Sequence, residues 1–312
     1  MKKYNVLLII TVISCLSGCL FHRDITPDDE CVDKPYNTSP VLQVFSDDYP
    51  HQYPYQAYYT STKNEIIVYE ALGNEDFGNV CIMNIKTGIK KRIIEKADNI
   101  SNITQNDQFS FIKDDQLWTT NTEGKDLTLT LTQRPEHYFW NPDGSLLCFN
   151  DSYASRFFYF LKNNDTVRTD FVRSRNAAWD YTGTKTASWQ LDRSETFSQL
   201  AIFDTLTKNT QLIPGCISEF AGGLLTWSRD NQFLFWSSQK GLFKTEWETG
   251  ATTQLRVFCW SRGYKIMQVS PDNEKLLCIR VDKKEKKGQG DNVKPYLIEM
   301  NIDGTNERRI DF

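Results

Sequence analysis

Apolar residues occur along most of the chain in short runs rich in Val, Ile, Phe, Tyr and Trp, and Gly, Asn and Asp separate these runs. Helical periodicity is scarce, so the pattern predicts short β-strands joined by turns. The runs also share a layout. Residues 140–144 (WNPDG) precede the apolar run 146–149, and residues 269–273 (VSPDN) precede the apolar run 276–279. We therefore expect an all-β repeat protein.

Six copies of this layout can be aligned, with anchors 37 to 48 residues apart. The anchors are Thr60, Ile103, Trp140, Trp179, Trp227 and Val269. The fifth position of each copy, counted from the anchor as the first, and one later position in each copy hold a residue that tolerates a left-handed backbone in a tight turn. These turn residues are Asn64, Asp107, Gly144, Gly183, Asn231 and Asn273, then Gly88, Gly124, Asn164, Asn209, Gly250 and Gly304. A repeat of about 40 residues with four strands and two tight turns has the size of one propeller blade. The prediction is a six-bladed β-propeller of four-stranded antiparallel blades.

The strand after the first turn of a repeat is apolar at nearly every position, as in residues 233–236 (FLFW). Such a strand is typical of burial on both faces, here between packed blades. A β-sandwich is the alternative, but it does not explain the repeat. The WNPDG turn resembles the W/F-S/N-P-D-G turn of the TolB-type six-bladed propeller family, and residues 53–312 carry the resemblance. TolB has an α/β domain before its propeller. In this sequence, the linker expected before residue 53 is too short to hold such a domain, so the resemblance does not imply a role in the Tol-Pal envelope system.

The N-terminal segment has the features of an export signal. Two lysines precede an apolar run at 6–16, which is shorter than the roughly 20 residues that cross a bilayer. Residues 16–19 (LSGC) resemble the bacterial lipobox, in which cleavage between Gly18 and Cys19 exposes a cysteine that becomes diacylated. An ordinary signal peptide with a chance cysteine is the alternative. The expected domains are a lipoprotein signal peptide at 1–18, a lipidated linker at 19–52 and a propeller at 53–312.

Acylation would decide where the protein resides. Two or three acyl chains, at about 0.8 kcal/mol per buried methylene, hold a protein stably on a membrane. We therefore expect Cys19 to tether the chain to the bacterial cell envelope. Leu20, rather than an aspartate, follows the cysteine, which by resemblance to enterobacterial sorting favours the outer membrane, on its periplasmic or surface side. The formal net charge of −4 provides no overall attraction for nucleic acid.

Motifs for catalysis and cofactor binding are scarce. Histidine occurs at positions 22, 51 and 137, so a Ser-His-Asp or Cys-His site would depend on His137. No G-x-S-x-G, H-E-x-x-H, P-loop or G-x-G-x-x-G sequence occurs. The cysteines beyond the signal peptide and Cys19 lack metal-ligand spacing and are Cys31, Cys81, Cys148, Cys216, Cys259 and Cys278. We expect no catalytic residues, no metal and no cofactor, and buried unpaired cysteines rather than disulfides between blades.

Strand order predicts which face binds a ligand. In an antiparallel four-stranded blade the first and third connections lie on one face of the ring, and the second and fourth on the other. The tight turns occupy the first face, so longer stretches, such as 151–156, 192–198 and 282–294, share the opposite face, where binding usually occurs. Arginine and aromatic residues there suit an anionic or sugar-like ligand. The candidate ligand-binding residues are Arg134, His137, Tyr138, Arg173, Arg175, Trp260, Arg262 and Tyr264. For each of these residues, the alternative interpretation is an ordinary solvated loop residue without a binding role.

The preferred function is therefore a membrane-tethered, non-enzymatic binding or scaffolding propeller of the cell envelope, with a protein or an anionic or saccharide ligand as its partner. A propeller enzyme of the lyase or glycosidase type, acting on an anionic saccharide, is the alternative. Substitution of His137 would distinguish the two functions, because His137 is the one histidine in the predicted propeller and a histidine-dependent enzyme would require it.

Overall fold

The computed structural model describes residues 52–72, 77–150, 157–162, 165–172, 177–191, 197–219, 224–238, 240–258, 262–286 and 289–311. The regular elements in these ranges are β-strands. No helix among the described residues is long and apolar enough to cross a membrane. The all-β prediction is confirmed for this part of the chain, while the predicted signal peptide and Cys19 lie outside it.

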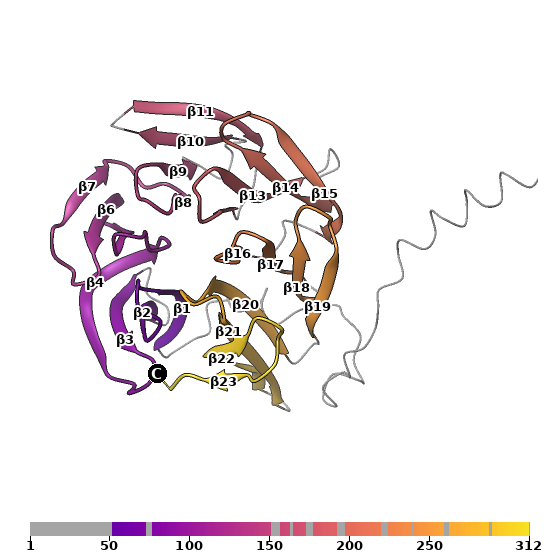
Figure 1. Ribbon diagram of the computed structural model, residues 1–312. Coiled ribbons are helices and arrows are strands. Elements are labelled where there is room, and N and C mark those ends of the chain that lie inside the picture. The colour runs from indigo at the N-terminus through magenta and orange to yellow at the C-terminus, as the bar shows by residue number, and fades with distance from the viewer. Residues whose placement is uncertain are drawn as a thin grey trace, which may run out of the picture.

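The strands form antiparallel sheets arranged around a central axis as a propeller (Figure 1). In four sheets of four strands each, neighbouring strands follow chain order, and the first strand of each sheet lies nearest the axis. These sheets contain β8 (His137–Trp140), β9 (Leu147–Asn150), β10 (Phe157–Lys162) and β11 (Asp165–Val172); β12 (Ala177–Trp179), β13 (Lys185–Leu191), β14 (Phe197–Asp204) and β15 (Thr210–Glu219); β16 (Leu225–Trp227), β17 (Phe233–Ser237), β18 (Gly241–Glu246) and β19 (Thr252–Val257); and β20 (Arg262–Val269), β21 (Lys275–Lys286), β22 (Gln289–Asn301) and β23 (Arg308–Arg309).

The first two repeats form one seven-stranded sheet instead of two separate sheets. Its strands are β1 (Gln52–Tyr59), β2 (Glu65–Leu72), β3 (Gly78–Asn84), β4 (Lys90–Ile100), β5 (Gln108–Lys113), β6 (Gln116–Asn121) and β7 (Thr128–Leu131). β4 joins its two parts, because it pairs with β3 up to Ala97 and then with β5 through Asp98 and Ile100. Lys96 and Asn99 have left-handed backbones (φ 54° and 56°) at this change of partner.

The predicted turn residues are largely confirmed. At the first turn of a repeat, φ lies between 54° and 75° at five of the predicted residues, which are Asp107, Gly144, Gly183, Asn231 and Asn273. Each of these residues donates its backbone N–H to the carbonyl three residues earlier. At the later turn of a repeat, φ is positive at the predicted residues Gly88, Gly124, Gly250 and Gly304. Asn64 was predicted wrongly, because it is not among the residues with positive φ. Asn209 was also wrong: the left-handed residue is Lys208 (φ 61°), whose N–H closes the turn onto the Asp204 carbonyl. Asn164 lies outside the described residues.

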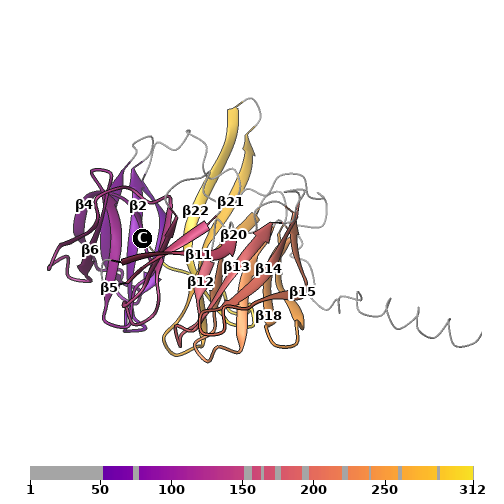
Figure 2. The same cartoon turned by 90° about the horizontal axis from the view of Figure 1, so that it is seen from above.

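The predicted stretch 282–294 is not a loop. Its residues extend β21 and β22 into a long hairpin, with Asp282 paired to Lys294 and Lys284 paired to Asn292. Figure 2 shows this hairpin projecting from the ring beyond the other strands. The prediction failed because lysine and glutamate are poor strand formers, while the long register with β22 holds them in a strand here.

The first turns of successive repeats contact one another around the ring. The bonds are Ser61 N–H to Asp107 Oδ1 (2.7 Å), Gln105 N–H to Pro142 O (2.6 Å), Tyr181 N–H to Asn231 Oδ1 (2.7 Å), Arg229 N–H to Asn273 Oδ1 (2.9 Å) and Lys63 Nζ to Asp272 Oδ2 (3.0 Å). The last of these bonds joins the first repeat to the final one. The third and fourth repeats approach closely at Gly183, where an added Cβ would lie 3.5 Å from Asn141 Nδ2. The tight-turn face is therefore a closed ring of turns.

The anchor tryptophans also act between sheets. Trp140 Nε1 donates to Ser110 Oγ of β5 (2.8 Å), and Trp227 Nε1 donates to the carbonyl of Ala178 in β12 (3.0 Å). Trp179 lies against the preceding sheet, with its ring 5.6 Å from that of Phe160. The aromatic anchor of the repeat thus packs each of these sheets onto the one before it.

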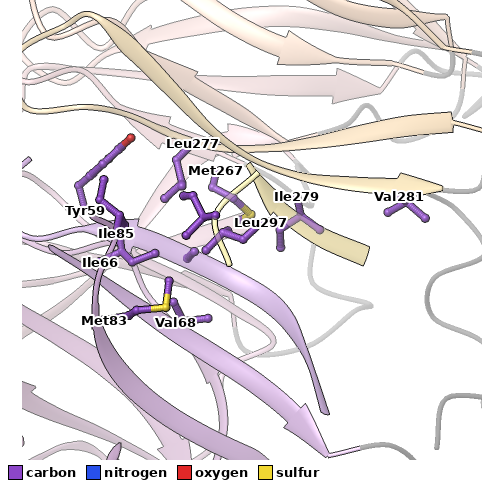
Figure 3. Close-up of a cluster of buried hydrophobic side chains, with 12 residues drawn as sticks. Tyr59, Ile66, Val68, Met83, Ile85, Met267, Leu277, Ile279, Val281 and Leu297 are labelled. Carbon is purple, nitrogen blue, oxygen red and sulfur yellow. The ribbon is translucent and has the colours of Figure 1, made fainter. Parts of the chain in front are cut away.

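The first and last sheets of the ring meet in a buried cluster, shown in Figure 3, which includes Ile66 and Met83 from the first sheet and Leu277 from the last. Tyr59 makes the polar contacts of this junction. Its N–H donates to Gln268 Oε1 (2.7 Å), and its hydroxyl donates to Glu299 Oε1 (2.6 Å). Hydrogen bonds and apolar packing therefore close the ring together.

Removing the Tyr59 hydroxyl tests this junction. A buried hydrogen bond to a charged group contributes about 1.5–3 kcal/mol, and Tyr59 is 1% exposed. We expect Tyr59→Phe to lower the free energy of unfolding by that amount in urea titrations followed by tryptophan fluorescence. Tyr296→Phe is the control, since Tyr296 is partly exposed and its ring lies beneath Arg309. Equal losses in the two variants would contradict a special role for the Tyr59 contact.

The cysteine prediction is confirmed for the described residues. Cys81, Cys148, Cys216 and Cys278 are buried and free, so Cys148 is not bridged to Cys278. Burial raises the pKa of the Cys148 thiol well above its usual range, which keeps it protonated and unreactive. These cysteines serve as small core residues.

Candidate functional site

A cavity of about 290 Å³ lies between the inner strands of the ring. Residues of β1, β4, β8, β12, β16 and β20 line it. Each inner strand runs toward the ring of tight turns, so its earlier residues, such as Gln56, His137 and Ala177, lie toward the opposite end. Thr60, Gln105, Pro142, Tyr181 and Pro271 line the tight-turn end.

The two sides of the cavity differ in chemistry. β1, β4 and β8 contribute mostly amide, phenol and imidazole groups, from Gln56, Tyr58, Asn99, Asn102, His137 and Tyr138. β12, β20 and the segment at β16 contribute mostly aliphatic groups, from Ala177, Ala178, Leu224, Leu225, Ile266 and Met267. Thr226, Arg229 and Gln268 also lie on the second side, and Ile100 and Phe139 on the first, so the lining is mixed on both sides.

Several amides of the lining hold neighbouring inner strands together. Gln56 Oε1 accepts a hydrogen bond from the Ile100 N–H (2.7 Å). Asn102 bonds both backbone groups of Trp140, accepting from its N–H and donating to its carbonyl, each at 2.8 Å. Because these inner strands do not pair as neighbours in a sheet, the amide side chains take the place of a backbone ladder. They belong to the framework of the cavity.

Arg229 bridges three sheets at the tight-turn end of the cavity. Its guanidinium carbon lies 4.1 Å from the centre of the Tyr181 ring, and its nitrogens donate to the carbonyls of Ser270 (3.3 Å) and Val269 (3.4 Å). Among the described residues of the lining, it is the one lysine, arginine, aspartate or glutamate. Its charge is therefore engaged by the protein itself.

Two of the predicted ligand-binding residues line the cavity together. His137 is partly buried and Tyr138 is 8% exposed, and they are adjacent at the start of β8. The Tyr138 hydroxyl oxygen is buried and has no hydrogen-bond partner within the described part of the chain. Burial, and secondarily the nearby Asp98 carboxylate, raise the pKa of Tyr138 well above its usual range. The hydroxyl therefore remains a hydrogen-bond donor at neutral pH.

Two other candidates lie elsewhere. Arg134 is half exposed and forms ion pairs with Asp98 and, at 3.6 Å, with Asp115. Tyr264 is 1% exposed and donates its hydroxyl to Glu307 (2.8 Å). Neither residue lines the cavity, because carboxylates distant in the sequence engage their polar groups.

The remaining candidates cannot be placed in the site. Arg173, Arg175 and Trp260 lie outside the described residues. Arg262 is the first residue of β20, and only its backbone belongs to the described part of the chain. Sequence reasoning missed Tyr58, Asn99 and Trp179, which line the cavity. Their position in the sequence could have identified them, because each lies on an inner strand shortly before the first turn of a repeat.

Trp179 is a second buried donor beside the cavity. It is 6% exposed, and its Nε1 has no hydrogen-bond partner among the residues described. The equivalent tryptophans, Trp140 and Trp227, donate to the preceding sheet. Within the described residues, no three His, Cys, Asp or Glu side chains come together in a way that could hold a metal ion. Both unpartnered donor atoms are enclosed by the protein, so the surface of the cavity is formed by other polar and apolar groups.

Comparison with known proteins shows the fold. No family model matches the sequence, and no curated protein matches it significantly. Similar solved structures include a putative TolB from Agrobacterium tumefaciens (TM-score 0.59, 12% identity, 75% of this chain and 88% of that chain). TolB from Acinetobacter baumannii has a TM-score of 0.54 at 13% identity over 64% of this chain. An oligogalacturonate lyase in complex with manganese has a TM-score of 0.50 at 10% identity over 79% of this chain and 88% of that chain.

These similarities define a class and not an activity. The chain spans about half (53%) of the A. baumannii TolB chain. At such identities the likeness shows the architecture alone. The protein is a β-propeller of the structural class that includes TolB and this lyase, and its described repeats have the arrangement of that class.

Proposed function

We propose that the protein is a membrane-tethered, non-enzymatic binding propeller of the bacterial cell envelope, with its ligand site in the central cavity. The observation that carries the proposal is the cavity of about 290 Å³ at the centre of the ring, whose lining brings together residues of β1, β4, β8, β12, β16 and β20. Central cavities lined by several elements are where small ligands usually bind.

The proposed ring has six blades. Support comes from the closed series of contacts between first turns, which ends with Lys63 on Asp272. The seven-stranded sheet is then two blades that share β4, which changes partner from β3 to β5 within one strand.

The binding role is favoured over catalysis by the groups that line the cavity. Its amides hold the framework, and Arg229 is engaged with Tyr181 and two carbonyls. His137 distinguishes the two roles. Substitution with alanine should leave ligand affinity within about threefold, which corresponds to less than one ordinary hydrogen bond. Turnover of oligogalacturonate or a glycoside by the wild-type chain, abolished in His137→Ala, would replace the binding role with an enzymatic one.

The site can be tested inside cells. The photo-reactive residue p-benzoylphenylalanine would be placed at His137, which lines the cavity, and at exposed Lys208 on the tight-turn face as the matched control. We expect irradiation to produce a mass adduct on the chain labelled at 137 and not on the chain labelled at 208, read by intact-mass spectrometry. Equal adducts at both positions, or an adduct at 208 alone, would contradict a site in the cavity.

The tether is tested at Cys19. Its thiol is the proposed acylation site, at the end of the LSGC sequence, and the proposed location is the outer membrane. We expect Cys19→Ser to abolish incorporation of labelled palmitate and to give unprocessed or soluble protein in fractionated cells. Cys15→Ser, within the signal peptide, is the control and should be labelled normally. Equal labelling of the Cys19→Ser chain would rule out this anchor.

A further inference from the structure

The long hairpin of β21 and β22 extends past the body of the last sheet (Figure 2). β21 pairs with β20 only as far as Asp282, which lies opposite Arg262, the first residue of β20. The pairing of β21 with β22 continues beyond that point, to Lys286 and Gln289. Since a strand rises about 3.3 Å per residue, residues 283–286 carry the hairpin roughly 13 Å past the start of β20. Among the described residues, this part of the hairpin pairs with no third strand.

The hairpin end, which comprises residues 283–286 and 289–294, is rich in lysine. It contains four lysines, one glutamate and one aspartate, in a chain whose formal net charge is −4. At the base of the hairpin, Asp282 forms an ion pair with Arg280 (2.8 Å), and Arg280 also pairs with Glu307 (2.6 Å). Both carboxylates at the base are engaged by this arginine, so the hairpin end keeps an excess of positive charge.

The tight-turn face has the opposite charge. Its eleven turns in the described part of the chain contain thirteen Asp and Glu residues and five Lys and Arg residues. These turns are residues 60–65, 103–107, 140–145, 179–184, 227–232 and 269–274, then 84–89, 121–126, 204–209, 246–251 and 301–306. Because such turns join β20 to β21 and β22 to β23, the hairpin end lies at the other face of the ring. An anionic surface would therefore repel the tight-turn face and attract the hairpin end.

The chain enters the ring at the same face as the hairpin end. β1 runs toward its tight turn at 60–65, so its first residue, Gln52, lies at the face opposite the tight turns. Ala57 of β1 belongs to one buried cluster with Val281, which lies next to the base of the hairpin. The linker proposed before β1 therefore joins the ring beside the hairpin, and a membrane that holds Cys19 is reached from this face.

From these features we infer that the hairpin end contacts an anionic phospholipid surface, with Lys283, Lys284 and Lys286 supplying the positive charge. Each lysine near such a surface strengthens binding about fivefold. The attraction falls off within about 10 Å at moderate salt, so a projection of roughly 13 Å brings these lysines into range ahead of the acidic turns. This inference goes beyond the proposed function, and it uses the proposed tether only for the direction in which the ring faces.

The test is the rate of lysine acetylation in the full chain, added to preformed vesicles of phosphatidylcholine alone or of equal parts of phosphatidylcholine and phosphatidylglycerol. Mass spectrometry after chymotrypsin digestion follows each site. We expect Lys283, Lys284 and Lys286 to react at least about fivefold more slowly on the anionic vesicles. Exposed Lys86 and Lys208, on the tight-turn face, should react equally on both. Sodium chloride at about 0.5 M should remove the protection, because it shortens the screening length.

A pair of matched variants separates the hairpin end from the overall charge of the chain. Lys284→Gln combined with Lys286→Gln should weaken the contact at least about tenfold, so that Lys294 reacts as fast on anionic vesicles as on neutral ones. Lys86→Gln combined with Lys208→Gln removes the same charge from exposed positions of the tight-turn face. This control should leave the protection of Lys294 unchanged.

Three results would overturn the inference. They are equal rates for the hairpin lysines on the two kinds of vesicle, which would leave the hairpin end to a protein partner; equal protection of Lys86 and Lys208; or unchanged protection of Lys294 in the Lys284→Gln, Lys286→Gln chain. Palmitate labelling at Cys19 tests the tether separately. A chain that carries no palmitate but shows protected hairpin lysines on anionic vesicles would reject the tether and support the hairpin contact.

Discussion

Replacing Trp227 with alanine should lower the free energy of unfolding by about 3–5 kcal/mol, the usual cost of deleting a large buried aromatic side chain. Trp227 is 0% exposed and packs in the cluster that contains Trp189 and Trp236. Its truncation would leave a void between two sheets and remove the donor to the Ala178 carbonyl. Because Ala178 lines the cavity, the loss should reach the site as well as the core.

Urea unfolding followed by far-ultraviolet circular dichroism measures this effect without depending on the deleted fluorophore. Trp118→Ala is the matched control. Trp118 is partly exposed on β6, and its Nε1 has no hydrogen-bond partner among the described residues. We expect the control to lose less than half as much stability. A Trp227→Ala loss below about 2 kcal/mol, or one equal to the control, would contradict the role of the anchor tryptophan between sheets.

Gly304→Ala should cost about 2–4 kcal/mol, and Gly88→Ala only about 1 kcal/mol, although both residues have left-handed backbones. The φ angles are 84° and 70°, so the backbone strain of an alanine is similar. A Cβ at residue 304 would lie 2.9 Å from the carbonyl oxygen of Leu255 in the preceding sheet, whereas a Cβ at residue 88 would have no neighbour within 4 Å. The difference measures the contact between sheets.

The same unfolding experiment compares the two glycine variants directly. Gly304→Asn should also be costly, because asparagine relieves backbone strain and not the overlap with Leu255. Near-equal losses for Gly304→Ala and Gly88→Ala would mean that the neighbouring sheet moves aside and that the close approach has no energetic role.

Much of the fold was predictable because turn chemistry and strand burial repeat along the chain. Gly144 and Asn273 are recognisable from sequence, since few residue types accept a left-handed backbone. Lys208 was not recognisable, because its conformation depends on the bond from its N–H to the Asp204 carbonyl. The continuous pairing of β4 with both β3 and β5 was likewise hidden, since no change in composition marks it.

The site was less predictable than the fold. His137 and Tyr138 were identified from their place at the start of an inner strand, and they line the cavity. Arg134 and Tyr264 have similar positions in sequence, but carboxylates from distant parts of the chain engage them. The direction of a side chain and the presence of a partner depend on which strands become neighbours. That information lies in the closed ring and not in any one repeat.

Hydrogen–deuterium exchange of the full chain, with and without the molecule identified from the photo-crosslinked adduct at position 137, tests the central claim that the cavity is the ligand site. Exchange reports protection of individual segments, so the inner strands and the turns can be compared in one sample. The account predicts slower exchange in β8 and β12, with no change in the tight turns at 84–89 and 204–209. Protection confined to those turns, or spread equally over both faces of the ring, would contradict it.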